Sequence, residues 1–145
     1  MEEKEIMSDE KVGELLDQAT ALVEEGKFSE AEELLKQLED SAPDNALVQY
    51  NLSVIYLIRL KKDLENYRMW EDYSDEEGLF EEAIAHCQTA IELDPNLVPA
   101  HNNLGTLYAI RGWNDKAIEQ WEESLSLHPD QPDVREDLTA LREDL

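Results

Sequence analysis

The chain has 145 residues, which fits a single domain of ordinary size. Its 36 Asp and Glu against 12 Lys and Arg give a formal net charge of −24, which disfavours binding to nucleic acid or to anionic membrane surfaces. Cys87 is the only cysteine, so no disulfide can form within the chain. No segment approaches the roughly 18 apolar residues of a membrane span. We therefore expect a cytoplasmic protein without membrane insertion.

Three proline-terminated segments recur along the chain, at residues 28–45, 80–97 and 113–131. In each of them an alanine precedes the proline by twelve residues, and a large or soft apolar residue lies four positions after the alanine. The three sets are Ala31, Leu35 and Pro43; Ala83, Cys87 and Pro95; and Ala117, Trp121 and Pro129. Because the residue before a proline disfavours the helical conformation, each proline is expected to end a helix.

A second pattern, with apolar residues around a small one, precedes each of these segments. Its members are Ala19 and Leu22 in the first copy, Leu52, Ser53 and Tyr56 in the second, and Leu104, Gly105 and Tyr108 in the third. Leu22 and Tyr56 are 34 residues apart. The helical spacing of the apolar residues predicts a helix, and the small residue lets a second helix approach closely.

These residues resemble the tetratricopeptide repeat (TPR), a helix–turn–helix unit with an L-G-x-x-Y…A-x-x-x-F…P pattern. The resemblance covers residues 12–131 and implies an all-α fold in one domain, 1–145. That fold is a right-handed helical solenoid of three repeats, at about 12–45, 46–97 and 98–131. One hairpin cannot bury its apolar face alone, so consecutive hairpins are expected to stack.

The second repeat is longer than the others. Tyr56 and Tyr108 are 52 residues apart, which exceeds 34 by 18. Eighteen residues are five helical turns, so the spacing predicts a first helix from about Asn45 to Trp70 and a second from about Asp75 to Leu93. Ser74, with Glu77 three residues later, is the expected helix cap.

The insertion is rich in bases and aromatic residues. We interpret Arg59, Lys61, Lys62, Tyr67, Arg68, Trp70 and Tyr73 as a candidate surface. These side chains either fold back on the second repeat or its neighbour or bind a partner; a plain spacer is the third reading.

Residues 132–145 are expected to form a capping helix. Pro132 suits a helix start. Val134, Leu138, Leu141 and Leu145 then follow at spacings of four, three and four, and charged residues occupy the other faces. Such a helix hides the last apolar face of a solenoid.

The TPR resemblance implies that the first helices of successive repeats line a concave groove for a peptide or helix of a partner. The candidate groove residues are Leu16, Thr20, Val23, Leu47, Tyr50, Asn51, Val54, Leu57, Asn102, Asn103 and Thr106. Tyr50 and Leu57 are candidates to receive an apolar side chain. Asn51 and Asn103 either bond a peptide backbone or bond between adjacent helices.

A known subset of the family grips the terminal carboxylate of chaperones with a lysine-rich clamp. The clamp positions hold Gly13 and Asp17 in the first helix of the first repeat, and Pro99 and Asn103 in the first helix of the third repeat. Only Asn51, in the second repeat, matches the clamp pattern. We therefore expect this chain not to bind chaperone tails.

No motif predicts catalysis, a metal site or a cofactor. His86, His101 and His128 do not pair at helical spacing and are interpreted as surface or boundary residues. Cys87 aligns with a core position and is interpreted as a buried structural thiol.

The function expected from these features is protein–protein interaction, as an adaptor, an assembly factor or an accessory subunit. The partner segment is expected to be basic or apolar, although the acidity could equally serve solubility alone. The alternative is a transient chaperone for an apolar or basic client, similar to secretion chaperones. An enzyme or a cofactor-carrying subunit is the remote alternative, and the oligomeric state stays open.

Overall fold

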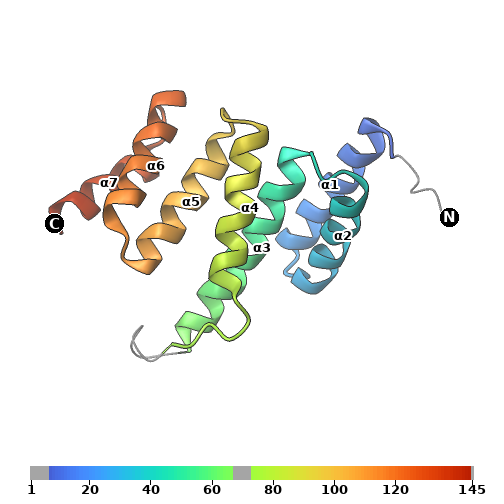
Figure 1. The fold of residues 1–145 in the computed structure, drawn as a ribbon, viewed down its shortest axis with the longest axis horizontal. Helices are drawn as coiled ribbons and strands as arrows, with labels where there is room; N and C mark the ends of the chain where they lie inside the picture. Colours follow the sequence, from blue (N-terminus) through green and yellow to red (C-terminus); the bar gives the residue numbers. More distant parts are fainter. Residues whose placement is uncertain (1–6, 67–72, 145) are drawn as a thin grey trace.

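The structure, a computed structural model, describes residues 7–66 and 73–144, and all regular elements in these ranges are α-helices (Figure 1). They are α1 (Asp9–Glu24), α2 (Phe28–Ser41), α3 (Ala46–Glu65), α4 (Leu79–Leu93), α5 (Val98–Arg111), α6 (Asn114–Leu127) and α7 (Pro132–Glu143). Each helix packs against the next one in the chain, so the helices form one elongated stack from α1 to α7. The expected all-α solenoid of three helix pairs with a C-terminal capping helix is confirmed.

In each pair, a small residue of the first helix corresponds to a larger apolar residue of the second. The corresponding positions hold Ala19 and Leu35 in the first pair, Ser53 and Cys87 in the second, and Gly105 and Trp121 in the third. A Cβ atom on Gly105 would lie 2.5 Å from Cδ1 of Trp121, which is too close for any real contact. The smallest residue therefore faces the largest, and this match sets how closely α5 approaches α6.

Two histidine–glutamine hydrogen bonds join α3 to α4 and α5 to α6. His86 Nδ1 lies 2.7 Å from Gln49 Oε1, and His101 Nδ1 lies 2.9 Å from Gln120 Oε1, at corresponding positions with the two residue types exchanged. Nε2 of His101 also lies 2.8 Å from the carbonyl oxygen of Pro95. The interpretation of His101 as a surface or boundary residue is wrong, because His101 is only 5% exposed and forms one of these hydrogen bonds between helices.

The extra residues of the second repeat divide between a longer helix and a longer loop. α3 has 20 residues against 14 in α5, and 13 residues join α3 to α4 against two between α5 and α6. α3 ends at Glu65, earlier than the expected Trp70, because Asn66 closes it: its side-chain Nδ2 donates to the carbonyl oxygen of Lys62 at 3.1 Å.

α4 begins at Leu79 rather than at the expected Asp75. Asp75 itself caps the helix, since its two carboxylate oxygens accept the backbone N–H groups of Leu79 at 2.9 Å and Phe80 at 2.8 Å. Gly78 precedes the helix with a φ of +67°, a left-handed conformation that interrupts helix and favours glycine. The expected cap at Ser74 is therefore wrong.

α7 covers the end of the stack. Its Leu138 is buried, and Val134 and Leu141 pack partly against the core, as their spacing predicts. Arg142 forms an ion pair with Glu122 of α6. Leu145 lies outside the described residues.

Candidate functional site: the first-helix face

The first helices of the three pairs lie side by side. α1 contacts α3, and α3 contacts α5, in addition to their contacts with α2, α4 and α6. Together α1, α3 and α5 form one face of the stack, which we call the first-helix face. All the candidate groove residues belong to these three helices.

The candidate groove residues differ in how much they offer to a partner. Leu16 and Leu57 are each 7% exposed, so they support the face from below. Thr20 and Leu47 are exposed, and Leu47 is among the large apolar side chains most open to solvent. The half-buried members are Val23, Tyr50, Asn51, Val54, Asn102, Asn103 and Thr106.

The two candidate amides are held differently. Asn51 Nδ2 donates to the carbonyl oxygen of Leu47, one turn earlier in the same helix, at 2.7 Å. Asn103 Nδ2 is buried and has no hydrogen-bond partner among the described residues. An unpaired buried donor is costly, and a ligand acceptor that reached it after a rotation of the amide would relieve that cost.

Asn102 takes part in a hydrogen-bond network within the fold, and its sequence position did not indicate this role. Its Nδ2 donates to Gln131 Oε1 at 2.8 Å, and its carbonyl oxygen accepts from Trp121 Nε1 at 3.3 Å. Ser124 also donates its hydroxyl to Asn102 Oδ1. The side chain thus joins α5 to α6 and to the residue that precedes α7.

The middle of the first-helix face carries no formal charge. Residues 45–58 and 95–110 contain no Asp, Glu, Lys or Arg, although 33% of the whole chain is charged. Burial raises the pKa of Tyr50, so its phenol stays protonated at neutral pH. The middle of this face therefore offers apolar surface, amides and hydroxyl groups.

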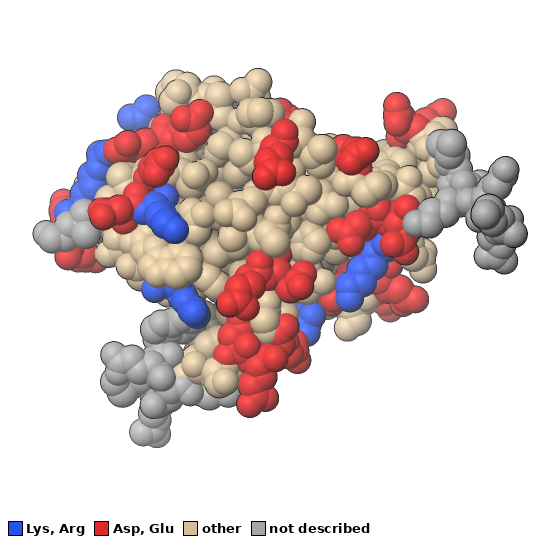
Figure 2. All heavy atoms as spheres, in the orientation of Figure 1, with Lys and Arg blue, Asp and Glu red and all other residues tan. Residues whose placement is uncertain are grey.

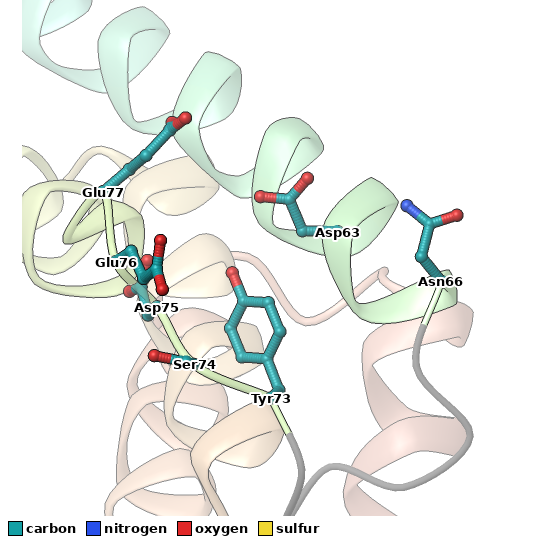
Figure 3. Close-up of a pocket in the computed structure, with 7 residues that line it drawn as sticks. All are labelled: Asp63, Asn66, Tyr73, Ser74, Asp75, Glu76 and Glu77. Atoms are coloured by element: carbon teal, nitrogen blue, oxygen red, sulfur yellow. The ribbon is translucent and has the colours of Figure 1, made fainter.

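Charges gather elsewhere on the molecule. Figure 2 shows carboxylates over α2 and around the loop that leads into α4. That loop and the end of α3 enclose a cavity of about 280 Å³ (Figure 3), lined by Asp63, Asn66, Tyr73, Ser74, Asp75, Glu76 and Glu77. Two of its carboxylates already have partners: Asp75 caps α4, and Glu77 pairs with Arg59.

Apart from Lys61, the described residues of the candidate insertion surface contact other parts of the fold. Arg59 also pairs with Glu32 of α2 at 3.3 Å, and Lys62 Nζ lies 4.6 Å from the centre of the Phe28 ring. Tyr73 packs partly against the core, whereas Lys61 is exposed. Tyr67, Arg68 and Trp70 lie outside the described residues.

Neither a metal site nor a membrane span emerges from the described ranges. No group of three or more His, Cys, Asp or Glu residues there could hold a metal ion. No helix in them is long and apolar enough to cross a membrane.

The stacked helix pairs define a helical-repeat protein. A tetratricopeptide-repeat model matches residues 16–98, and a second model with the same description matches residues 86–119. The first match alone covers more than half of the chain. The chain therefore belongs to the tetratricopeptide-repeat family.

Solved TPR domains share the architecture. The first TPR domain of Spaghetti (RPAP3), bound to the HSP90 peptide SRMEEVD, is similar with a TM-score of 0.76, at 20% identity over 96% of each chain. The TPR domain of Sgt2 from Aspergillus fumigatus is similar with a TM-score of 0.74, at 16% identity over 99% of this chain and 84% of that one.

A curated relative is much longer than this chain. The antiviral innate immune response effector IFIT1 of Homo sapiens is 24% identical over 116 residues, which are 78% of this chain and 24% of that protein. The chain thus spans about a quarter of the length of that relative.

Proposed function

We propose that this chain is a protein-interaction module that binds a segment of a partner protein on its first-helix face. It acts as an adaptor, an assembly factor or an accessory subunit, and it works by binding rather than by catalysis. The observation that carries the proposal is the absence of charged side chains from residues 45–58 and 95–110, which include most of α3 and α5, in an otherwise acidic molecule. The single cysteine, a free buried thiol, supports a reducing location such as the cytoplasm.

The residues on this face favour an apolar or basic segment over a chaperone tail. The HSP90 peptide on the Spaghetti domain ends in the acidic sequence EEVD. Here the expected clamp positions hold Gly13, Asp17, Pro99 and Asn103, none of which is a cation. A terminal carboxylate would meet Asp17 and a net charge of −24, both of which repel it.

Two matched double variants test the face. Leu47→Ala with Asn51→Ala removes an exposed leucine and a side chain that bonds its own helix, both on α3. Thr89→Ala with Leu93→Ala removes the same two features from α4, where Leu93 is 39% exposed and Thr89 Oγ1 donates to Ala85. In affinity purification from the native host, the α3 variant should lose its partner and the α4 variant should keep it. Equal retention by both variants refutes binding on the first-helix face.

The same purification separates the two modes of binding. A stoichiometric partner that stays through salt washing supports a stable subunit. Several substoichiometric partners that share apolar or basic segments support a transient chaperone.

A further inference from the structure

α7 lies where the first helix of a fourth repeat would begin. Val98 follows Pro95 by three residues, and Pro132 follows Pro129 by three, so the two helix starts are 34 residues apart. The inward side chains keep the same phase: Leu138 of α7 is buried, as is Leu104 of α5 at the corresponding position. α7 packs on α6 as α5 packs on α4, so the 34-residue register assigns Asp137 to the position of Asn103 and Glu136 to that of Asn102.

By this register, one row of corresponding positions includes four helices. It consists of Asp17 on α1, Asn51 on α3, Asn103 on α5 and Asp137 on α7, separated by 34, 52 and 34 residues. The adjacent row consists of Leu16, Tyr50, Asn102 and Glu136. In the first row, carboxylates stand at both ends and amides in the middle.

We propose that the first-helix face, extended by α7, binds a partner segment with an uncharged, apolar centre and a basic residue at each end. This inference rests on the proposed function and specifies the partner. The central residues of the segment lie over Leu47 and Val54, while its two cations meet Asp17 and the pair Glu136 and Asp137.

The carboxylates at the ends of the row are available to a partner. Asp17, Glu136 and Asp137 are exposed, and none of them forms an ion pair with a described residue. The two bases of α7 are engaged elsewhere: Arg135 Nε donates to the carbonyl oxygen of Pro129 at 2.9 Å, and Arg142 pairs with Glu122. Between the ends lies Asn103, whose buried Nδ2 has no partner among the described residues and would reach a ligand acceptor after a rotation of the amide.

The row also fixes the spacing of the two cations. Neighbouring helices lie about 8–10 Å apart, so if α7 follows α5 by the same step as α5 follows α3, the three steps from α1 to α7 span roughly 27 Å. An extended chain advances about 3.3 Å per residue, so the two basic residues should be about eight positions apart. In a helical segment, which rises about 1.5 Å per residue, the separation would be about eighteen positions.

A display library of random peptides tests the composition directly. The full chain is used to select from random peptides of about twelve residues, a length that covers the extended span. We expect enrichment of Lys or Arg at two positions about eight residues apart, with apolar residues between them. Selected peptides whose binding depends on Leu47 and Asn51 but which lack this pattern refute the inference and leave the proposed function standing. If no selected peptide depends on these two residues, both fall.

Charge-neutralising variants then test the assigned residues with one selected peptide. Asp17→Asn, Glu136→Gln and Asp137→Asn together should weaken its binding about tenfold, since each partly exposed ion pair contributes modestly. The control, with the same change in net charge, is Glu33→Gln, Glu119→Gln and Glu123→Gln, all exposed on second helices. The control should weaken binding less than about twofold, because those charges are distant and screened. Equal weakening by both triple variants shows that net charge alone attracts the peptide and overturns the inference.

Discussion

The contact between Gly105 and Trp121 allows a substitution to be followed from geometry to stability. Gly105→Ala adds a Cβ atom 2.5 Å from Cδ1 of a Trp121 ring that is only 6% exposed. Overpacking of this kind costs about 1–3 kcal/mol, and displacing the ring weakens the bond from its Nε1 to Asn102, which is worth about 1 kcal/mol. Alanine recovers about 1 kcal/mol of helix propensity. The net expectation is a loss of about 2 kcal/mol from the free energy of unfolding.

Urea denaturation followed by circular dichroism measures this loss, and Gly13→Ala is the matched control. Gly13 also lies inside a helix, but nothing comes within 4 Å of a Cβ atom built there. Gly13→Ala should therefore raise the free energy of unfolding by about 0.5–1 kcal/mol. Adding Trp121→Phe should reduce the damage done by Gly105→Ala, because the smaller ring leaves room for the methyl group. If the two alanine substitutions shift stability in the same direction, the steric argument is refuted.

Three further predictions concern caps and titration. Asp75→Ala should lower the free energy of unfolding by about 1 kcal/mol in urea denaturation, whereas Ser74→Ala should leave it within about 0.5 kcal/mol, and the reverse ranking would contradict the assigned cap. Burial raises the pKa of Cys87 from 9.0 to about 11, so the thiol should resist iodoacetamide at pH 8 until urea unfolds the chain; rapid alkylation of the native protein would contradict its burial. Because the pKa of this thiol is higher in the folded state than in the unfolded state, the thiol contributes its full stabilisation below pH 9 and loses it as the pH rises to about 11. The free energy of unfolding should fall by about 2–3 kcal/mol over this range, and Cys87→Ala should remove this pH dependence.

The repeat architecture could be predicted because it depends on spacing and side-chain size. A small residue at one position and a larger residue in the next helix recur at intervals of 34 and 52 residues, and packing requires both. The histidines show the limit of this reasoning. Nothing in the sequence around His101 indicates that Gln120, 19 residues later, lies 2.9 Å away, because that contact exists only once α5 and α6 have packed.

The ends of the inserted segment could not be predicted because the sequence there contains two competing capping signals. Ser74 and Glu77 match a capping box, but Asp75 offers two charged acceptor oxygens and Gly78 readily takes a left-handed conformation. Both alternatives are compatible with the sequence, and the burial of Leu79 and Phe80 is consistent with the second.

The adjacent asparagines of α5 show a similar limit for the candidate site. Asn102 and Asn103 are identical in sequence terms, yet one completes a hydrogen-bond network and the other leaves a buried donor unpaired. Which of them can serve a ligand depends on the position of Gln131, 29 residues from Asn102. Helical phase alone therefore predicts which residues share a face, and only the packed structure shows that the Asn102 side chain is bonded within the fold whereas the Asn103 amide is not.

The location of charge says more about the partner than the net charge does. At about 0.1 M salt the Debye length is about 10 Å, so carboxylates on the far sides of α2 and α6 act on a bound segment only weakly. They can still speed its approach at low salt, because the summed field of −24 attracts any cation. Once the segment is bound, discrimination depends on the local row, where Asn51 and Asn103 favour an uncharged centre and Asp17 and Asp137 favour cations at the ends. A uniformly basic segment would approach quickly but would place charges over Leu47 and Val54, in a stretch of α3 that itself carries no carboxylate. The distribution of charge thus selects a segment with basic ends and an apolar centre over one that is merely basic.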